Sequence, residues 1–309
     1  MNAEILPDEK RVVASSTITY HNNSPDSLNA LVLELAQNVH SEGVPRKETV
    51  EVTGGINIDS VRIGENTLRE ITMQGQRGYY IDGTRMFISV PSVIAPNSSE
   101  TVELSWSFKV PQEGAGGRMG YSEDNLFFIA YWYPQVMVYD DVFGWFTDRF
   151  LVNAEFYHEF GDYEVNITAP EQWLVTSTGK FNNPKEVLAP NILEKYQEAQ
   201  QSDTTVSIIG SNDFGKFTQA TNNGKLTWSF EADNIKDFAF SATSQSLWEG
   251  ARAPVGDLDG DNQQDYTFVD AVYRLSAPKW KKAVEYAQHS FFSLGVYRPG
   301  LPVVAHDIR

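Results

Sequence analysis

The sequence predicts a mainly β protein, in which a large antiparallel β-saddle or sandwich over residues 1–245 is followed by a short, truncated α-helical segment over residues 246–309. In the first part, hydrophobic and polar residues alternate along many short runs, which is typical of strands that bury one face. Turn-forming pairs such as Asn-Gly and Asn-Pro separate these runs. After about residue 250, the hydrophobic period becomes that of a helix.

The clearest strand pattern covers residues 101–110, where every second residue is hydrophobic. The residues of that face are Val102, Leu104, Trp106, Phe108 and Val110. Residues 225–232 repeat the alternation with Leu226, Trp228 and Phe230, and residues 16–22 and 162–170 are similar. A short helix is predicted around residues 191–201, between the last strands.

A second helix is predicted over residues 276–295, with Ser276 as its N-cap and Gly295 at its end. One face of this helix is hydrophobic and carries Trp280, Ala283, Val284, Ala287, Phe291 and Leu294. The pattern predicts that this helix begins a second domain, of which this chain contains only the first part. An uncovered hydrophobic face promotes association, so the pattern also predicts self-association through this helix.

Composition excludes several kinds of partner. The formal net charge of −17 argues against nucleic acid and against an anionic membrane surface, because both require basic patches. The chain has no cysteine, which excludes a disulfide framework and a catalytic thiolate. No stretch reaches the hydrophobic length of a membrane span. The first ten residues lack the pattern of a signal peptide, and the localisation stays open.

The stretch "VGDLDGDNQQDY" carries four aspartates within nine residues. Calcium takes six to eight oxygen ligands, and carboxylates on alternate residues of a tight loop can supply several of them. The predicted ligands of a structural calcium ion are the side chains of Asp257, Asp259, Asp261 and Asp265 and the backbone carbonyl of Gln263. The alternative is a solvated acidic loop. An EF-hand is excluded, because Phe268 stands where that motif requires glutamate.

Several blocks of the sequence resemble the aminopeptidase N family of zinc metallopeptidases (gluzincins). The blocks are "YWYPQVMVYDDVFGW" (131–145), "EFYHEFGDYEVNITAP" (155–170), "WLVTSTGKFNNP" (173–184) and "DFAFSATSQSLWEG" (237–250). In that family an N-terminal β-saddle packs against a thermolysin-like catalytic domain. The resemblance implies that residues 1–245 are the saddle and that residues 246–309 begin the catalytic domain.

The zinc-binding motif of that family is missing from this sequence. Two histidines four residues apart on a helix, with glutamate after the first, would hold the metal and supply the general base. The only His-Glu pair here starts at His158, and the residue four positions on is Asp162. Zinc is therefore expected only in a full-length family member, and this chain alone is not expected to hydrolyse peptides.

The resemblance also implies a contribution of the saddle to substrate binding. In the family, a segment of the saddle reaches into the active-site cleft and helps hold the free amine of the peptide. The matching stretch here is 128–135, which gives Ala130, Tyr131 and Gln135 as candidate substrate-binding residues. Tyr131 stands where a polar amide is expected, which puts the recognition of the amine in doubt.

Two functions remain open from the sequence. In the first, the chain is the N-terminal portion of an aminopeptidase N-like zinc metallopeptidase and helps to shape the cleft for a peptide substrate. In the second, it is a stand-alone, non-catalytic β-saddle that binds or scaffolds a partner and carries a structural calcium loop.

Overall fold

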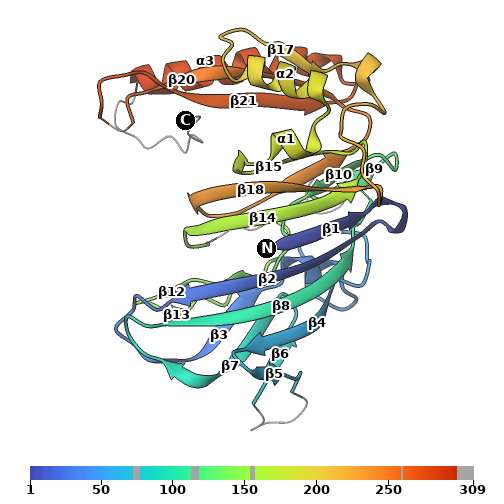
Figure 1. The fold of residues 1–309 in the computed structure, drawn as a ribbon. Coiled ribbons are helices and arrows are strands. Elements are labelled where there is room, and N and C mark those ends of the chain that lie inside the picture. The colour runs from blue at the N-terminus through green and yellow to red at the C-terminus, as the bar shows by residue number, and fades with distance from the viewer. Residues whose placement is uncertain (72–76, 113–117, 154–156, 259, 298–309) are drawn as a thin grey trace.

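The computed structural model describes residues 1–71, 77–112, 118–153, 157–258 and 260–297; for residues 292–297 it describes only the backbone. The chain is mainly β, as the sequence predicts. In the part of the chain that the structure describes, twenty-one strands form five sheets, and the strands β18, β14, β1, β2, β8 and β4 follow one another from the middle to the bottom of Figure 1.

An eight-stranded sheet forms the body of the molecule, in the order β16-β18-β14-β1-β2-β8-β4-β5. Its neighbours are antiparallel except for the parallel pair β1 and β14. The strands are β1 (Asn2–Leu6), β2 (Arg11–His21), β4 (Ile56–Ile63), β5 (Asn66–Leu68), β8 (Ser99–Lys109), β14 (Gly161–Pro170), β16 (Lys180–Phe181) and β18 (Lys225–Ile235).

Two four-stranded sheets and one hairpin complete the saddle. The first has the order β15 (Leu174–Ser177), β19 (Phe240–Thr243), β10 (Leu126–Ile129) and β9 (Gly120–Ser122). The second has the order β11 (Gln135–Val136), β3 (Leu28–Glu34), β7 (Arg85–Ile94) and β6 (Tyr79–Asp82). The hairpin pairs β12 (Tyr139–Asp140) with β13 (Gly144–Trp145).

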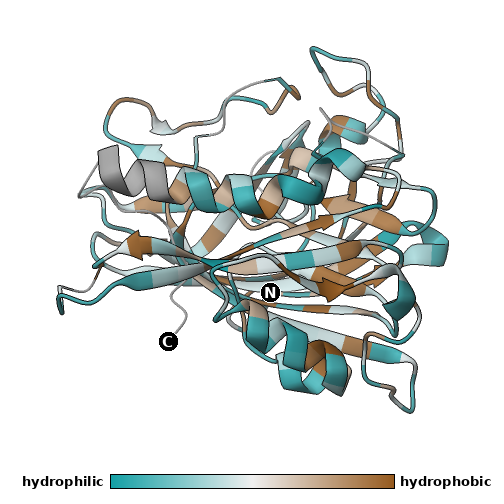
Figure 2. Ribbon diagram, turned by 90° about the horizontal axis from the view of Figure 1, so that it is seen from above, coloured by the Kyte–Doolittle hydropathy of each residue, from teal (hydrophilic) through white to brown (hydrophobic). Residues whose placement is uncertain are grey.

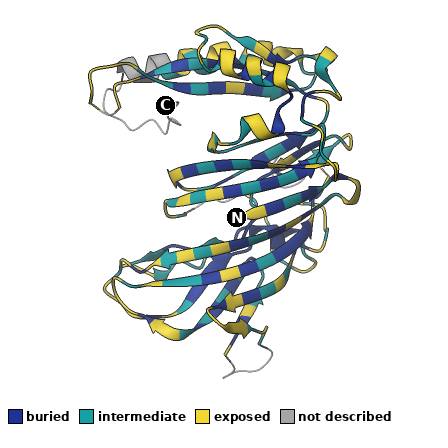
Figure 3. Cartoon of the chain, viewed as in Figure 1, coloured by how far each residue is buried: buried dark blue, intermediate teal, exposed yellow. Residues whose placement is uncertain are grey.

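The predicted alternation is confirmed in the core of the saddle. The hydrophobic residues at alternate positions of β8, including Trp106, are buried, and so are those of β18, including Trp228. Bands of buried and exposed residues alternate along these strands in Figure 3, and the same strands alternate in hydropathy in Figure 2. The predicted helix around 191–201 is α2 (Pro190–Ala199), preceded by α1 (Pro184–Val187).

The last part of the chain forms a separate sheet, which lies above the others in Figure 1. It contains β17 (Val206–Ile209), β20 (Leu247–Gly256) and β21 (Asp265–Tyr273), and α3 (Ala283–Tyr297) packs against it. These four elements are called the C-terminal layer below. Its first strand precedes the predicted boundary between residues 245 and 246, and that boundary stays a prediction.

Two details predicted for the late helix are wrong. It begins with a 3₁₀ turn, Pro278–Lys282, in which Ser276 is not the cap, and α3 continues past Gly295 to Tyr297. Trp280 is 58% exposed, because a 3₁₀ turn advances each residue by a larger angle than an α-helix and rotates this side chain off the hydrophobic face. Val284 is buried against the sheet, and Phe291 packs there as well. Self-association through this helix stays a prediction.

Elsewhere in the described part of the chain, short 3₁₀ helices also occur at Pro7–Glu9, Ala36–His40 and Ser211–Asp213. Among the described residues, no helix is both long and hydrophobic enough to cross a membrane.

Candidate functional site

Three of the family-like sequence blocks meet in space at one junction. The Trp132 indole donates a hydrogen bond to the carbonyl of Phe238 (2.9 Å), and the Tyr133 hydroxyl donates to Asp237 Oδ1 (3.0 Å). The same hydroxyl lies 3.2 Å from that of Tyr163. Blocks 131–145, 155–170 and 237–250 are thus joined by one buried network, which we call the block junction.

The block junction is rigid and polar in a hydrophobic setting. Burial, and then the negative charge of Asp237, raise the pKa of Tyr133 well above its usual range, so this phenol stays a neutral donor. The indole of Trp106 adds a hydrogen bond to the carbonyl of Trp132 (2.9 Å). A fully connected network of this kind fixes the local backbone.

The predicted binding residues Ala130 and Tyr131 lie at the edge of this network. Ala130 is nearly buried, and Tyr131 is partly exposed with φ of 55°, a left-handed conformation that non-glycine residues rarely adopt. Gln37 Nε2 donates to the Tyr131 carbonyl (2.9 Å), and Arg118 donates to the Tyr131 hydroxyl (3.1 Å). Such backbone strain is retained where the surroundings over-determine it, and it clusters at functional sites.

The third predicted residue, Gln135, starts the short strand β11. It pairs with Glu34 of β3, and its side-chain amide donates to the carbonyl of Lys236 (2.7 Å). This hydrogen bond fixes the Gln135 amide against Lys236. The pairing residue, Glu34, lines a cavity. Ala130, Tyr131 and Gln135 do not themselves line this cavity, and their role in substrate binding stays a prediction.

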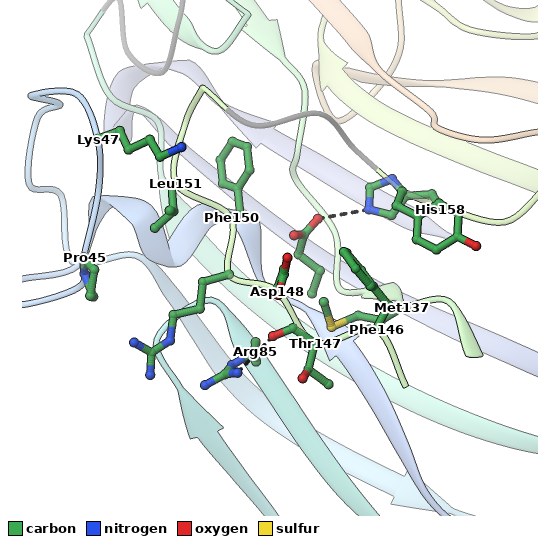
Figure 4. A pocket seen from close by; sticks show the side chains of 13 residues that line it. Pro45, Lys47, Arg85, Met137, Phe146, Thr147, Asp148, Phe150, Leu151 and His158 are labelled. Carbon is green, nitrogen blue, oxygen red and sulfur yellow. Dashed lines mark hydrogen bonds and ion pairs between the residues drawn. The ribbon is translucent and has the colours of Figure 1, made fainter. Parts of the chain in front are cut away.

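That cavity, called the saddle pocket below, has a volume of about 640 Å³. Pockets of this size suit a small ligand. Its lining residues, shown in Figure 4, are Glu34, Pro45, Lys47, Arg85, Met137, Phe146, Thr147, Asp148, Arg149, Phe150, Leu151, Tyr157 and His158.

One wall of the saddle pocket is an extended segment, residues 146–151, without regular secondary structure. Hydrogen bonds hold it along its length: Phe150 N donates to Thr84 Oγ1 (2.9 Å), Arg85 to the Thr147 carbonyl (2.9 Å), and Lys47 N to the Leu151 carbonyl (3.1 Å). The ring of Phe150 lies 5.3 Å from that of Tyr131, so the strained residue and the pocket wall are in contact.

Charged side chains gather around the pocket. Arg85 and Arg149 both pair with Asp82, the latter at 2.7 Å. At another wall, His158 Nε2 lies 3.0 Å from Glu34 Oε2, and both side chains are more than nine-tenths buried. In Figure 4, Lys47 and Arg85 lie to the left of His158, with Asp148 between them.

Sequence reasoning missed the pairing of Glu34 with His158. The two residues are 124 positions apart, and His158 was considered only as a zinc ligand. The available signals were a single glutamate at the end of a hydrophobic run, Leu28–Glu34, and an isolated histidine inside a family-like block. Neither signal identifies the other residue as its partner.

The acidic loop lies at the end of the β20–β21 hairpin. Asp257 accepts hydrogen bonds from the backbone of Gly260 (2.7 Å) and Asn262 (2.9 Å), and Asp265 accepts one from Leu258 (2.7 Å). The side chain of Asp261 bonds with Gln263. Asp259 lies outside the described residues, so calcium binding by this loop stays a prediction.

The single His-Glu pair of the sequence does not lie on a helix. Asp162, four positions after His158, lies on strand β14 rather than on a helix, and the imidazole of His158 faces Glu34. Within the described ranges, no three histidine or acidic side chains come close enough to hold a metal ion.

Comparison with known proteins gives matches only among solved structures. No protein-family model and no curated protein matches the sequence. A point mutant of the M1 zinc metallopeptidase from Deinococcus radiodurans is similar at 10% identity over 86% of this chain and 45% of that chain, with a TM-score of 0.45. The same mutant bound to a Tyr-Ser-Ala substrate is similar at 10% identity over 87% of this chain and 45% of that chain, with a TM-score of 0.45. For the unmutated enzyme, the identity is 10% over 86% of this chain and 45% of that chain, with a TM-score of 0.43. The chain spans less than half the length of these structures.

Proposed function

We propose that this chain is the N-terminal portion of an aminopeptidase N-like zinc metallopeptidase, that it helps to shape the cleft for a peptide substrate, and that it lacks the zinc site itself. The observation that supports this function is the block junction, where the family-like blocks converge. The junction holds Tyr131 in a strained conformation beside the saddle pocket.

Rigidity is the physical contribution of the saddle to such a cleft. A peptide loses less free energy on binding when the wall that it contacts is already ordered. The segment 128–135 is fixed at Trp132, Tyr133 and Gln135, all of which have hydrogen-bond partners elsewhere in the saddle. Tyr131, which directly precedes these anchors, remains partly exposed.

Photo-crosslinking tests this role directly. A short peptide with a free amine and a benzoylphenylalanine should label residues 128–137 and 146–151, and excess unmodified peptide should compete. Tyr131→Ala should reduce the labelling several-fold, whereas Tyr286→Ala, which removes an exposed ring on α3, should leave it unchanged. Labelling spread evenly over the surface would contradict a cleft at this place.

An activity assay tests the missing zinc site. The purified chain should release no product from amino-acyl anilides, with or without added zinc. Turnover that a chelator abolishes would overturn this part of the proposal. The alternative function, a stand-alone binding or scaffold module, is separated from it by reading the source gene past Arg309 for a His-Glu-x-x-His motif.

We also propose that the loop at 257–265 binds a structural calcium ion. The carboxylates of Asp257 and Asp265, which accept backbone hydrogen bonds within the loop, support this proposal. Calcium should raise the melting temperature at neutral pH, and less so at acid pH, because the ligands must be ionised. Asp259→Ala should remove most of this response. A chelator-treated wild-type chain that takes up no calcium in calorimetric titration would leave only an acidic loop.

A further inference from the structure

The saddle pocket contains unpaired charges of both signs. The side chains of Lys47 and Asp148 line it, and neither has an ion pair or hydrogen bond with the part of the chain that the structure describes. Both are exposed, so they are hydrated and available to a ligand. A ligand with only one charge would satisfy just one of them.

A second positive charge adds to that of Lys47. Arg85 and Arg149 share the single carboxylate of Asp82, so among the described residues the two guanidinium charges face one paired carboxylate. The Nε atoms of both arginines are buried and find no hydrogen-bond partner within the described ranges. Arginine recognises carboxylates through a planar fork of donors, so this wall favours a ligand carboxylate.

The opposite charge gathers around Glu34 and Asp148. Glu34 is held by His158, which keeps its carboxylate fixed at the edge of the cavity. Asp148 stands between this pair and Lys47 in Figure 4. Two carboxylates on one side of a cavity favour a ligand amine there.

Hydrophobic side chains form the rest of the pocket lining. Met137, Phe146, Phe150, Leu151 and Tyr157 all line the pocket. The rings of Phe146 and Tyr157 meet edge to face, with centroids 5.2 Å apart and an interplanar angle of 89°. A flat or branched hydrophobic side chain can pack against such rings with a gain beyond its buried area.

We propose that the saddle pocket binds the zwitterion of a free amino acid or dipeptide with a large hydrophobic side chain. Asp148 and Glu34 take the amine, Lys47 and the Arg85–Arg149 pair take the carboxylate, and the aromatic wall holds the side chain. The proposal rests on the proposed function, since it names the class of ligand that the peptide-binding saddle selects. The volume of about 640 Å³ is sufficient for such a molecule.

A titration with matched ligands tests each part of this recognition. L-phenylalanine should bind the whole chain, while phenylalaninamide, N-acetylphenylalanine and alanine should each bind at least about fivefold more weakly, since each loses one of the three contacts. Calorimetry or NMR shifts give the affinities. Equal affinity for phenylalanine and N-acetylphenylalanine, or no phenylalanine binding at millimolar concentration, would overturn the proposal.

Variants that keep the shape of the pocket identify the charges. Asp148→Asn should weaken the binding of phenylalanine about fivefold but leave the affinity for N-acetylphenylalanine unchanged. Lys47→Gln should also weaken the binding of phenylalanine about fivefold, but it should leave the affinity for phenylalaninamide unchanged. Asp141→Asn and Lys185→Gln, which change exposed charges outside the pocket, should have no effect. Control variants that weaken binding as much as the pocket variants would refute the assignment.

The two proposals can fail separately. Peptide crosslinks at 128–137 without binding of phenylalanine would overturn the proposal of a zwitterion pocket and support the proposed cleft. Binding of phenylalanine together with crosslinks elsewhere would support the zwitterion pocket and overturn the proposed cleft.

Discussion

The saddle and the C-terminal layer both bury one face of a sheet, but they do so with very different side chains. The core of the saddle contains Trp106, Trp132 and Trp228, which are fully buried and joined to other large rings. The core between α3 and its sheet is made mainly of small residues, such as Ala251 and Ala253. Hydrophobic stabilisation grows with buried area, so the saddle supplies most of the stability.

This difference explains where a site can be built. A strained residue such as Tyr131 costs about 1–3 kcal/mol, which only a strongly packed surrounding can maintain. The saddle provides that packing through the block junction. The C-terminal layer contacts the saddle through the rings of Tyr196 with Trp248 and Phe268. The segment after β21 also contacts the saddle, through the hydrogen bonds of Arg274 with Ser122 and Asn125.

The largest expected effect sharpens the comparison of the two cores. Trp106→Ala should lower the free energy of unfolding by about 3–5 kcal/mol, because it leaves a large cavity and an unpaired Trp132 carbonyl. Val284→Ala in the C-terminal layer should cost about 1–2 kcal/mol, since less buried area is lost. Urea unfolding gives both values, and equal costs would contradict the difference between the cores.

Glycines test backbone rigidity in the two regions. At Gly179 in the saddle, φ is +97°, and an added Cβ would meet the backbone carbonyl of Glu231, so Gly179→Ala should cost about 3 kcal/mol. At Gly250 in the C-terminal layer, the Cβ would meet the Phe268 ring at 2.5 Å, and the ring can move, so the cost should be about 1–2 kcal/mol.

Gly224→Ala is the matched control for these two variants. Its φ is +69° and nothing lies within 4 Å of the added Cβ, so only the conformational strain of about 1 kcal/mol remains. Melting curves of the three variants give the order of the costs. A Gly250 variant as unstable as the Gly179 variant would show that the C-terminal layer is as tightly packed as the saddle.

The smallest expected effect is a pH dependence that originates in the saddle. Burial lowers the pKa of His40 below its usual 6.5, and Nδ1 of the ring donates to the Glu51 carbonyl. The unfolded chain therefore binds this proton more readily, so the stability from His40 is present above about pH 6.5 and declines as the pH falls. His40→Gln should flatten the loss of stability between pH 7.5 and about 5.5.

His21→Gln serves as the control for this change, because His21 is exposed on β2. It should leave the pH dependence of the unfolding free energy as it is in the wild type. Identical slopes for wild type and His40→Gln would refute the role of His40.

The two regions also differ in how much of them the sequence predicts. The alternation around Trp106 and Trp228 identifies strands and their buried faces, because burial on one face imposes a period of two. In the C-terminal layer, the exposed position of Trp280 depends on a 3₁₀ turn that hydrophobic periodicity does not reveal. The pairing of β17 with β20 likewise depends on tertiary contacts across the segment between them.

The candidate site was predictable only in part. Tyr131 and Gln135, which a family-like segment predicts as binding residues, contact Phe150 and Glu34 of the pocket lining but do not line the pocket themselves, so their binding role stays a prediction. Asp148 and Lys47 were not found, since they are common surface residues that the fold brings to one cavity from segments about a hundred residues apart. Sequence patterns report burial along one element, whereas such a pocket depends on the packing of several elements.

Hydrogen exchange with and without a short hydrophobic peptide tests the central claim most directly, since it compares the two regions in one experiment. We predict slower amide exchange on peptide addition in residues 128–137 and 146–151, and unchanged exchange in α3. The order of protection in the free chain should place β8 and β14 above α3. Protection that appears in α3 rather than in the saddle segments would contradict the account.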